Sequence, residues 1–194
     1  MLSRLLRHRV ALWVTPVAAR VPFDANLLTT AGLAAAVWAG ALFAVGAFPL
    51  ASVAVAISGA ADILDGAVAR GRSAGTGRRG AFLDSAADRV SDNMIYGGIF
   101  LYYAALPGDN PVAVVATFIA ASASNVASYI KCRSEAVGIR CSVGLFKRQE
   151  RFVVIIAAGL FGPDSFVSAL IILAAFALES MAARFVYVYR RMSP

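Results

Sequence analysis

The chain has 194 residues, of which 60% are hydrophobic and 15% are charged, and its mean hydropathy is +0.74. Soluble domains carry about 25% charged residues, so this composition excludes an ordinary soluble domain and indicates a protein that lies in a membrane. The formal net charge of +7 fits cationic cytosolic loops and does not require a nucleic-acid partner.

The N-terminal segment, residues 1–20, combines apolar and basic residues at helical spacing. Apolar side chains recur from Leu2 to Val14, and Arg4, Arg7 and His8 fall on the other side of the helix that this spacing predicts. Such a helix lies at the membrane surface with its apolar face against the lipid. We therefore expect an amphipathic juxtamembrane helix over residues 1–20, followed by a membrane domain over residues 21–194.

The first two spans differ in where charge appears. Residues 27–47 are free of charge and long enough to cross a bilayer, which needs about 20 apolar residues. A second apolar run starts at Leu50 and reaches Asp62 after twelve residues, which as a helix cover about 18 Å of a hydrocarbon core about 30 Å thick. If this helix spans the bilayer, Asp62 and Asp65 lie at membrane depth.

Four further spans are predicted, and polar residues again lie toward one end of most of them. Uncharged residues 94–106 follow a segment rich in Asp and Arg, and residues 112–130 become polar in their second half. Residues 152–161 are too short alone, so the preceding "GLFKRQERF" must complete that span, and the last span covers about residues 166–189. All 18 Lys and Arg residues lie near the termini or within residues 70–89 and 131–151, which predicts six spans with both termini in the cytosol.

The polar halves of the second to fifth spans all lie on the predicted cytosolic side. Charged side chains that face lipid are costly, so we expect these groups to face one another around a water-accessible cavity. The predicted fold is therefore all-α, with six transmembrane helices, an N-terminal amphipathic interfacial helix and a polar cavity that opens to the cytosol.

Two pairs of aspartates occur in these otherwise apolar spans. Asp62 and Asp65 are three residues apart, and Asp84 and Asp88 are four apart, so each pair shares one helix face. Four adjacent carboxylates repel unless cations neutralise them, and oxygen ligands without His or Cys suit Mg²⁺, Mn²⁺ or Ca²⁺. Two divalent ions about 4 Å apart are a common device for phosphoryl displacement. Intramembrane carboxylates also mark cation transporters, which is the alternative from a different functional class.

The residues around these pairs resemble a family signature. The order Asp62-x-x-Asp65-Gly66-x-x-Ala69-Arg70, then Gly80-x-x-x-Asp84-x-x-x-Asp88, resembles the motif of the CDP-alcohol phosphotransferases, and the resemblance covers nearly the whole chain. It implies a homodimer in the bacterial plasma membrane, with two Mg²⁺ or Mn²⁺ ions held by the four aspartates and Asp88 also acting as general base. It further implies that CDP-diacylglycerol is bound by Asn26, Thr29, Gly66, Ala69, Arg70 and, from the spacer after them, Thr76.

A second polar segment, residues 128–152, indicates what the acceptor carries. Lys131 follows Ser128 by less than a turn and Arg151 lies inside the fifth span, as expected for a receptor of a phosphate. The pattern Ser-Tyr-Ile-Lys-x-Arg-x-Glu-Ala-x-Gly, followed by Arg-x-Glu-Arg, resembles the actinobacterial phosphatidylinositol-phosphate synthases. This resemblance implies transfer of a phosphatidyl group to inositol phosphate, whose phosphate would be bound by Ser128, Lys131, Arg151 and Arg191. The alternative within the family is a phosphatidylglycerophosphate synthase, which uses glycerol 3-phosphate.

Overall fold

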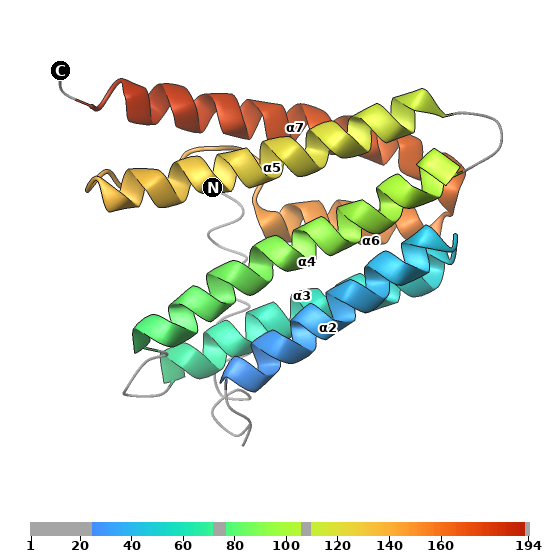
Figure 1. The fold of residues 1–194 in the computed structure, drawn as a ribbon, viewed down its shortest axis with the longest axis horizontal. Helices are drawn as coiled ribbons and strands as arrows, with labels where there is room; N and C mark the ends of the chain where they lie inside the picture. The colour runs from blue at the N-terminus through green and yellow to red at the C-terminus, as the bar shows by residue number, and fades with distance from the viewer. Residues whose placement is uncertain (1–24, 72–76, 106–109, 193–194) are drawn as a thin grey trace.

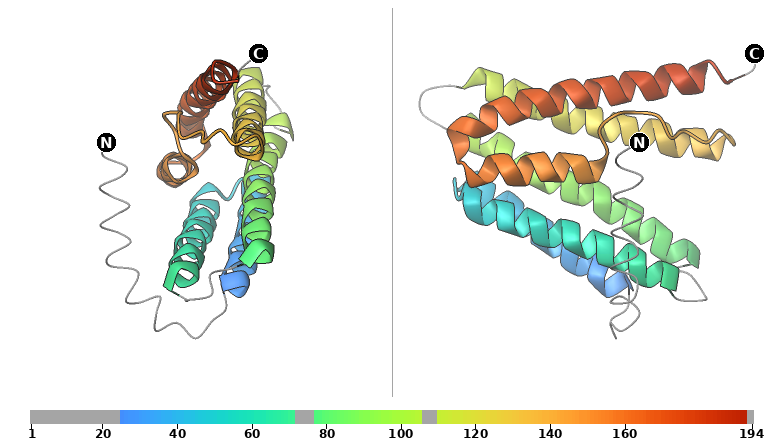
Figure 2. Two further views of the ribbon diagram at one scale, coloured as in Figure 1. Left: turned by 90° about the vertical axis from the view of Figure 1, so that its left-hand side faces the viewer. Right: turned by 180° about the vertical axis from the view of Figure 1, so that it is seen from behind.

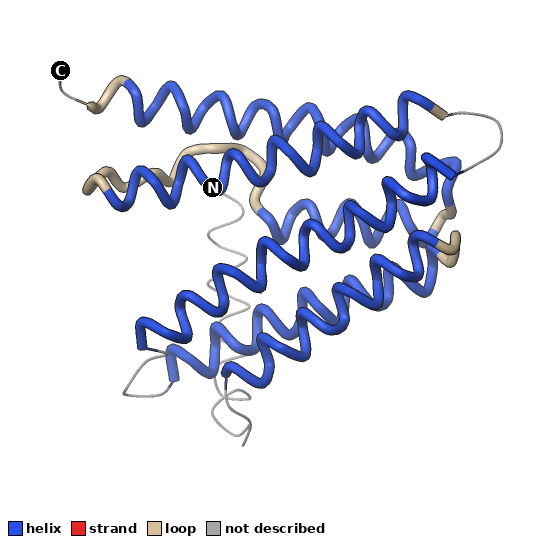
Figure 3. Tube along the Cα trace, viewed as in Figure 1, coloured by secondary structure: helices blue, strands red, loops and turns tan. Residues whose placement is uncertain are grey.

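The computed structural model describes residues 25–71, 77–105 and 110–192, and these residues form helices joined by loops (Figures 1 and 3). The amphipathic helix expected over residues 1–20 lies outside the described residues. The helices in chain order are α2 (Ala25–Ala44), α3 (Phe48–Gly71), α4 (Gly77–Ala105), α5 (Pro111–Ala136), α6 (Arg148–Leu160) and α7 (Pro163–Tyr189).

Four segments of the described chain are long and apolar enough to cross a membrane. They are Ala25–Ala44, Phe48–Val68, Pro111–Ala136 and Pro163–Tyr189. α4 is long enough but carries charged residues through its first half, and the 13 residues of α6 cover only about 20 Å as a helix. An all-helical protein with apolar spans is therefore confirmed, while the arrangement with six spans stays a prediction.

The helices form two groups that α6 joins. α2 packs against both α3 and α4, and α5 packs against α7. Figure 1 shows these two groups one above the other, and the two views of Figure 2 show α6 between them. α6 contacts α3 in the first group and α7 in the second, and α4 also contacts α5. Because α2 touches both of its neighbours, it determines how the aspartate-bearing halves of α3 and α4 face each other.

An aromatic cluster fixes one end of the bundle. Phe43, Phe48 and Phe166 are fully buried, and their ring centroids lie 5.2 to 5.5 Å apart. The Tyr103 hydroxyl donates a hydrogen bond to the carbonyl oxygen of Pro163 at 2.6 Å. These contacts join the end of α2, the start of α3, the end of α4 and the start of α7. The aspartates lie along the other halves of α3 and α4, away from this apolar end.

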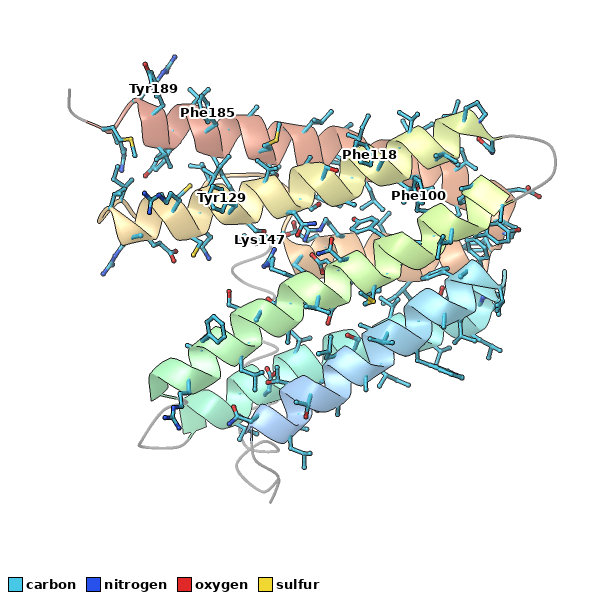
Figure 4. All side chains as sticks on the ribbon, in the orientation of Figure 1. Phe100, Phe118, Tyr129, Lys147, Phe185 and Tyr189 are labelled. Carbon is cyan, nitrogen blue, oxygen red and sulfur yellow. The ribbon has the colours of Figure 1, made fainter. Side chains whose placement is uncertain are left out.

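The outer faces of the helices also carry large apolar side chains. The exposed aromatic residues along α4, α5 and α7 include the five labelled in Figure 4: Phe100, Phe118, Tyr129, Phe185 and Tyr189. A water-soluble protein rarely exposes apolar side chains over so many helices. This surface is therefore typical of a protein surrounded by lipid.

Candidate active site

The structure brings three of the four predicted aspartates together. Three carboxylate oxygens, one each from Asp62, Asp84 and Asp88, lie within 4.8 Å of one another. Asp62 comes from α3, whereas Asp84 and Asp88 come from consecutive turns of α4. Metal–oxygen distances of about 2.0–2.6 Å place opposite ligands about 4–5 Å apart, so this spacing and this donor set fit Mg²⁺ or Mn²⁺.

Asp65 lies outside that group of three and has a partner of its own. Its side chain is buried, and its Oδ2 accepts a hydrogen bond from the Thr29 hydroxyl at 2.6 Å. Thr29, Asp62, Asp65 and Asp88 are among the residues that line a cavity of about 10 Å³, which has room for about one water molecule. Thr29 of α2 therefore lies next to the aspartates, and its contact with CDP-diacylglycerol stays a prediction.

Of the other residues predicted to bind CDP-diacylglycerol, those that the structure describes lie near the start of α2 and the end of α3. Asn26 is exposed in the first turn of α2, and Gly66 directly follows Asp65 on α3. Ala69 and Arg70 belong to the last turn of α3, where the structure does not describe their side chains, and Thr76 lies outside the described residues.

Arg148 joins the carboxylates, although no role was predicted for it from the sequence. Its Nη1 lies 2.7 Å from Oδ1 of Asp88 and 3.4 Å from Oδ2 of Asp62. Its Nε donates a hydrogen bond to Oδ1 of Asp92 at 2.8 Å, and its guanidinium lies over the ring of Phe152. The spacing of Asp84, Asp88 and Asp92 places three carboxylates on one face of α4. This row of negative charges was the available sequence signal that a cationic side chain such as Arg148 lies against that face.

A large cationic cavity adjoins this cluster. Its volume is about 750 Å³, and its lining comes from α4, α5, residues 138–147, α6 and α7. Seven of its fifteen lining residues are Lys or Arg, and two are acidic, so the cavity suits an anionic ligand. Lys147 of this lining lies in the space between α4 and α5 in Figure 4.

Three of the four predicted acceptor residues line this cavity. They are Ser128, Lys131 and Arg151, whereas Arg191 is not part of the lining and places its guanidinium 4.2 Å from the ring centre of Tyr187. Arg151 is buried, and its Nη2 donates a hydrogen bond to Asp92 at 2.8 Å. The structure therefore unites the predicted residues of α5 and α6 and leaves the one beyond α7 apart.

Two further arginines of the lining were not predicted. Arg89 of α4 donates a hydrogen bond to the Ser128 hydroxyl. Arg184 of α7 donates to the carbonyl oxygens of Ala127 and Val143, at 2.8 and 3.1 Å. Arg184 thus ties the non-helical segment after α5 to α5 and α7, and this segment forms one wall of the cavity. Sequence spacing gave no signal for either contact, because each joins residues far apart in the chain.

A comparison with known families agrees with the signature around the aspartates. The sequence profile described as CDP-alcohol phosphatidyltransferase matches residues 23–186, which is most of the chain. The chain belongs to the CDP-alcohol phosphatidyltransferase family. Both the carboxylate cluster and the cationic cavity of this family member lie within the matched residues.

Two relatives of this phosphatidyltransferase carry the names of inositol phosphate synthases. The archaetidylinositol phosphate synthase of Methanothermobacter thermautotrophicus is 35% identical over 184 residues, which cover 93% of this chain and 90% of that protein. The phosphatidylinositol phosphate synthase of Mycolicibacterium smegmatis is 43% identical over 149 residues, which cover 76% of this chain and 66% of that protein.

Solved structures extend the similarity to the fold. The phosphatidylinositol phosphate synthase of Mycobacterium tuberculosis with CDP-DAG bound superposes with a TM-score of 0.80 at 31% identity, and covers 93% of this chain and 98% of that chain. The structure of that synthase with manganese and citrate gives a TM-score of 0.81 at 31% identity, with 93% of each chain covered. This phosphatidyltransferase therefore shares its helical architecture with a synthase that has been solved both with CDP-DAG and with manganese.

Proposed function

We propose that this phosphatidyltransferase moves the phosphatidyl group of CDP-diacylglycerol to inositol phosphate and releases CMP. The observation that carries the proposal is that Asp88 and Arg148 line both the small cavity beside the aspartates and the large cationic cavity. The small cavity has carboxylates that suit divalent ions, and the large cavity has cationic side chains that suit a phosphorylated acceptor. The names of the relatives support inositol phosphate as that acceptor.

On the donor side, the four aspartates would hold two Mg²⁺ or Mn²⁺ ions. Asp62, Asp84 and Asp88 form one oxygen-rich group, and Asp65 would contribute to the second position. When bound, such ions polarise a phosphate and stabilise the charge that develops on the leaving group. The CDP-lipid would lie against the start of α2 and the end of α3, in contact with Asn26, Thr29, Gly66, Ala69, Arg70 and Thr76.

On the acceptor side, the cationic cavity would bind the phosphate of inositol phosphate. Lys131 and Arg151 supply charge, and Ser128 supplies a hydroxyl next to Arg89. For the fourth position we favour Arg184 over Arg191, because Arg184 lines the cavity. Charge-assisted bonds to several cations would fix the direction of the inositol ring, so positioning supplies a large share of the rate.

Asp88 is the proposed general base. The acceptor hydroxyl is a weak acid, so a carboxylate has to accept its proton as the oxygen attacks phosphorus. Oδ1 of Asp88 lies 2.7 Å from Nη1 of Arg148, whereas Oδ2 lies 3.8 Å from Nη2 of Arg89. Arg148 thus fixes one oxygen of this carboxylate, and the other is the better placed to accept the proton.

In the membrane, we propose six spans with a cytosolic cavity. The surface helix over residues 1–20 would precede a membrane domain over residues 21–194, and both termini would lie in the cytosol of a bacterial cell. The support is the distribution of the 18 Lys and Arg residues, which leaves the loops opposite the cavity without basic residues. A homodimer is the proposed assembly, since the resemblance to the family implies it.

A comparison of the two acceptors, each supplied alone, tests the proposed function. Purified protein in lipid nanodiscs would receive CDP-diacylglycerol, Mg²⁺ and either labelled inositol phosphate or labelled glycerol 3-phosphate, and CMP and labelled lipid would be measured. We expect CMP release and lipid labelling that depend on inositol phosphate. Efficient use of glycerol 3-phosphate with no use of inositol phosphate would instead assign the protein to the phosphatidylglycerophosphate synthases.

A further inference from the structure

Asp92 lies next to the proposed catalytic groups but has a different set of partners. It follows Asp88 by one turn of α4, and its side chain is only 2% exposed. Its Oδ1 accepts a hydrogen bond from Nε of Arg148, and its Oδ2 accepts one from Nη2 of Arg151, both at 2.8 Å. Its carboxylate is not part of the group of three that could hold a metal ion.

Both arginines come from the first turn of α6. The backbone N–H of Lys147 donates a hydrogen bond to the Glu150 carboxylate at 2.9 Å, which fixes the start of this helix. Arg148 and Arg151 share one face of the helix because they are three residues apart. α6 packs mainly against α3 and α7, and the two bonds to Asp92 connect its charged end to α4. Removing one partner from a buried charge pair leaves an uncompensated charge, so this geometry is strongly determined.

We propose that Asp92 is a positioning residue, which sets the direction of Arg148 toward the carboxylate cluster and of Arg151 toward the acceptor cavity. Arg148 bonds Asp92 through Nε, so its Nη1 extends to Asp62 and Asp88. Arg151 gives one nitrogen to Asp92 and keeps further N–H donors of its planar guanidinium for the cavity that it lines. One carboxylate thereby orients a cation beside each half of the site.

This arrangement has opposite consequences for the two ligands. A cation beside Asp62 and Asp88 opposes the binding of a divalent ion there, and Asp92 limits this effect because it holds Arg148 and offsets its charge. A cation held at the cavity wall favours an anionic acceptor. Loss of Asp92 should therefore weaken metal binding through Arg148 and acceptor binding through Arg151.

The test compares Asp92→Asn with Asp164→Asn, a matched change at an exposed position in the first turn of α7. Mn²⁺ affinity is measured without substrate from the electron paramagnetic resonance signal of free Mn²⁺, and the KM of each substrate is measured separately. For Asp92→Asn we expect the Kd of Mn²⁺ and the KM of inositol phosphate each to rise about tenfold, with the KM of CDP-diacylglycerol changed less than threefold. Asp164→Asn should match the wild type in all three.

A double substitution separates positioning from a simple charge effect. Asp92→Asn changes the Kd of Mn²⁺ by some factor in the wild type. In an Arg148→Gln background, this factor should be at least three times smaller. Equal changes in both backgrounds would mean that Asp92 acts as a distant charge and would overturn the proposal. If Asp92→Asn does not give monodisperse protein, Arg148→Gln alone decides: the Kd of Mn²⁺ should fall threefold or more, and an unchanged or raised Kd contradicts the role.

The inference rests on the proposed function, and the two can fail separately. Wild-type protein that binds no Mn²⁺ or does not use inositol phosphate would refute the proposed function. A wild type that does both, with an Asp92→Asn variant indistinguishable from Asp164→Asn, would refute only the positioning role.

Discussion

Replacing Gly98 with alanine should force α2 and α4 apart. The two helices cross at Gly40 and Gly98, where a Cβ on Gly98 would lie 1.9 Å from the carbonyl oxygen and 2.7 Å from the Cα of Gly40. Ordinary van der Waals contact begins at 3.4 Å, so the helices have to separate locally by about 1.5 Å. The opposing atoms belong to the backbone, so no side-chain rotation relieves the clash.

The cost of this separation can be set from the geometry. Adding a methyl group to a well-packed interior costs about 1–3 kcal/mol, and close contact between membrane helices depends on small residues. Since backbone atoms cannot give way, we expect a loss of about 3 kcal/mol at the upper end of that range. In a protein of this size, such a loss corresponds to an apparent Tm that is lower by about 6–12 °C. Activity should fall as well, because α2 holds α3 and α4 in register across the aspartates.

Gly97 provides the matched control. It is the neighbouring residue of the same helix, and a Cβ at this position would meet nothing within 4 Å. Gly97→Ala brings the same gain in helix propensity, up to about 1 kcal/mol, without the clash. Each variant is heated in detergent over a range of temperatures. The fraction of protein that stays monodisperse is measured by fluorescence-detected size-exclusion chromatography and gives the apparent Tm. Equal apparent Tm values for the two variants would refute the reasoning from the helix crossing.

Three further predictions concern the chemistry. Asp88→Asn should lower CMP release at least about 100-fold and retain binding of the CDP-lipid, since it removes the proton acceptor; normal turnover would contradict the assignment. Arg151→Ala should raise the KM of inositol phosphate roughly tenfold to hundredfold without changing that of CDP-diacylglycerol, whereas Arg133→Ala, on the exposed surface of α5, should change neither. Treatment with EDTA should abolish CMP release, and added Mg²⁺ or Mn²⁺ should restore it; full activity after chelation would exclude the metal role of the aspartates.

The positions of the helices could be predicted because they follow from local properties. Lengths of apolar runs indicated the helices now seen as α2, α3, α5 and α7, with ends that differ by a few residues, and the spacing of Asp84 and Asp88 placed them on one face of α4. The start of α6 was less well predicted. The stretch "GLFKRQERF" was expected to lie in the span, but the helix begins at Arg148. Gly144 has a φ of +109°, which breaks the helix, and Glu150 accepts the N–H of Lys147 at its start.

The partners of the charged groups were decided by the tertiary structure. The sequence showed that Arg148, Arg151 and Asp92 are charged residues in or near apolar spans, but their pairing depends on how α6 packs between α3 and α7. In the same way, the presence of Arg184 rather than Arg191 in the cavity depends on the path of the segment after α5. Hydrophobic periodicity is a local signal that fixes which residues form a helix and which face is polar. The approach of polar faces from different helices depends on contacts between distant residues, so only the packed bundle could decide it.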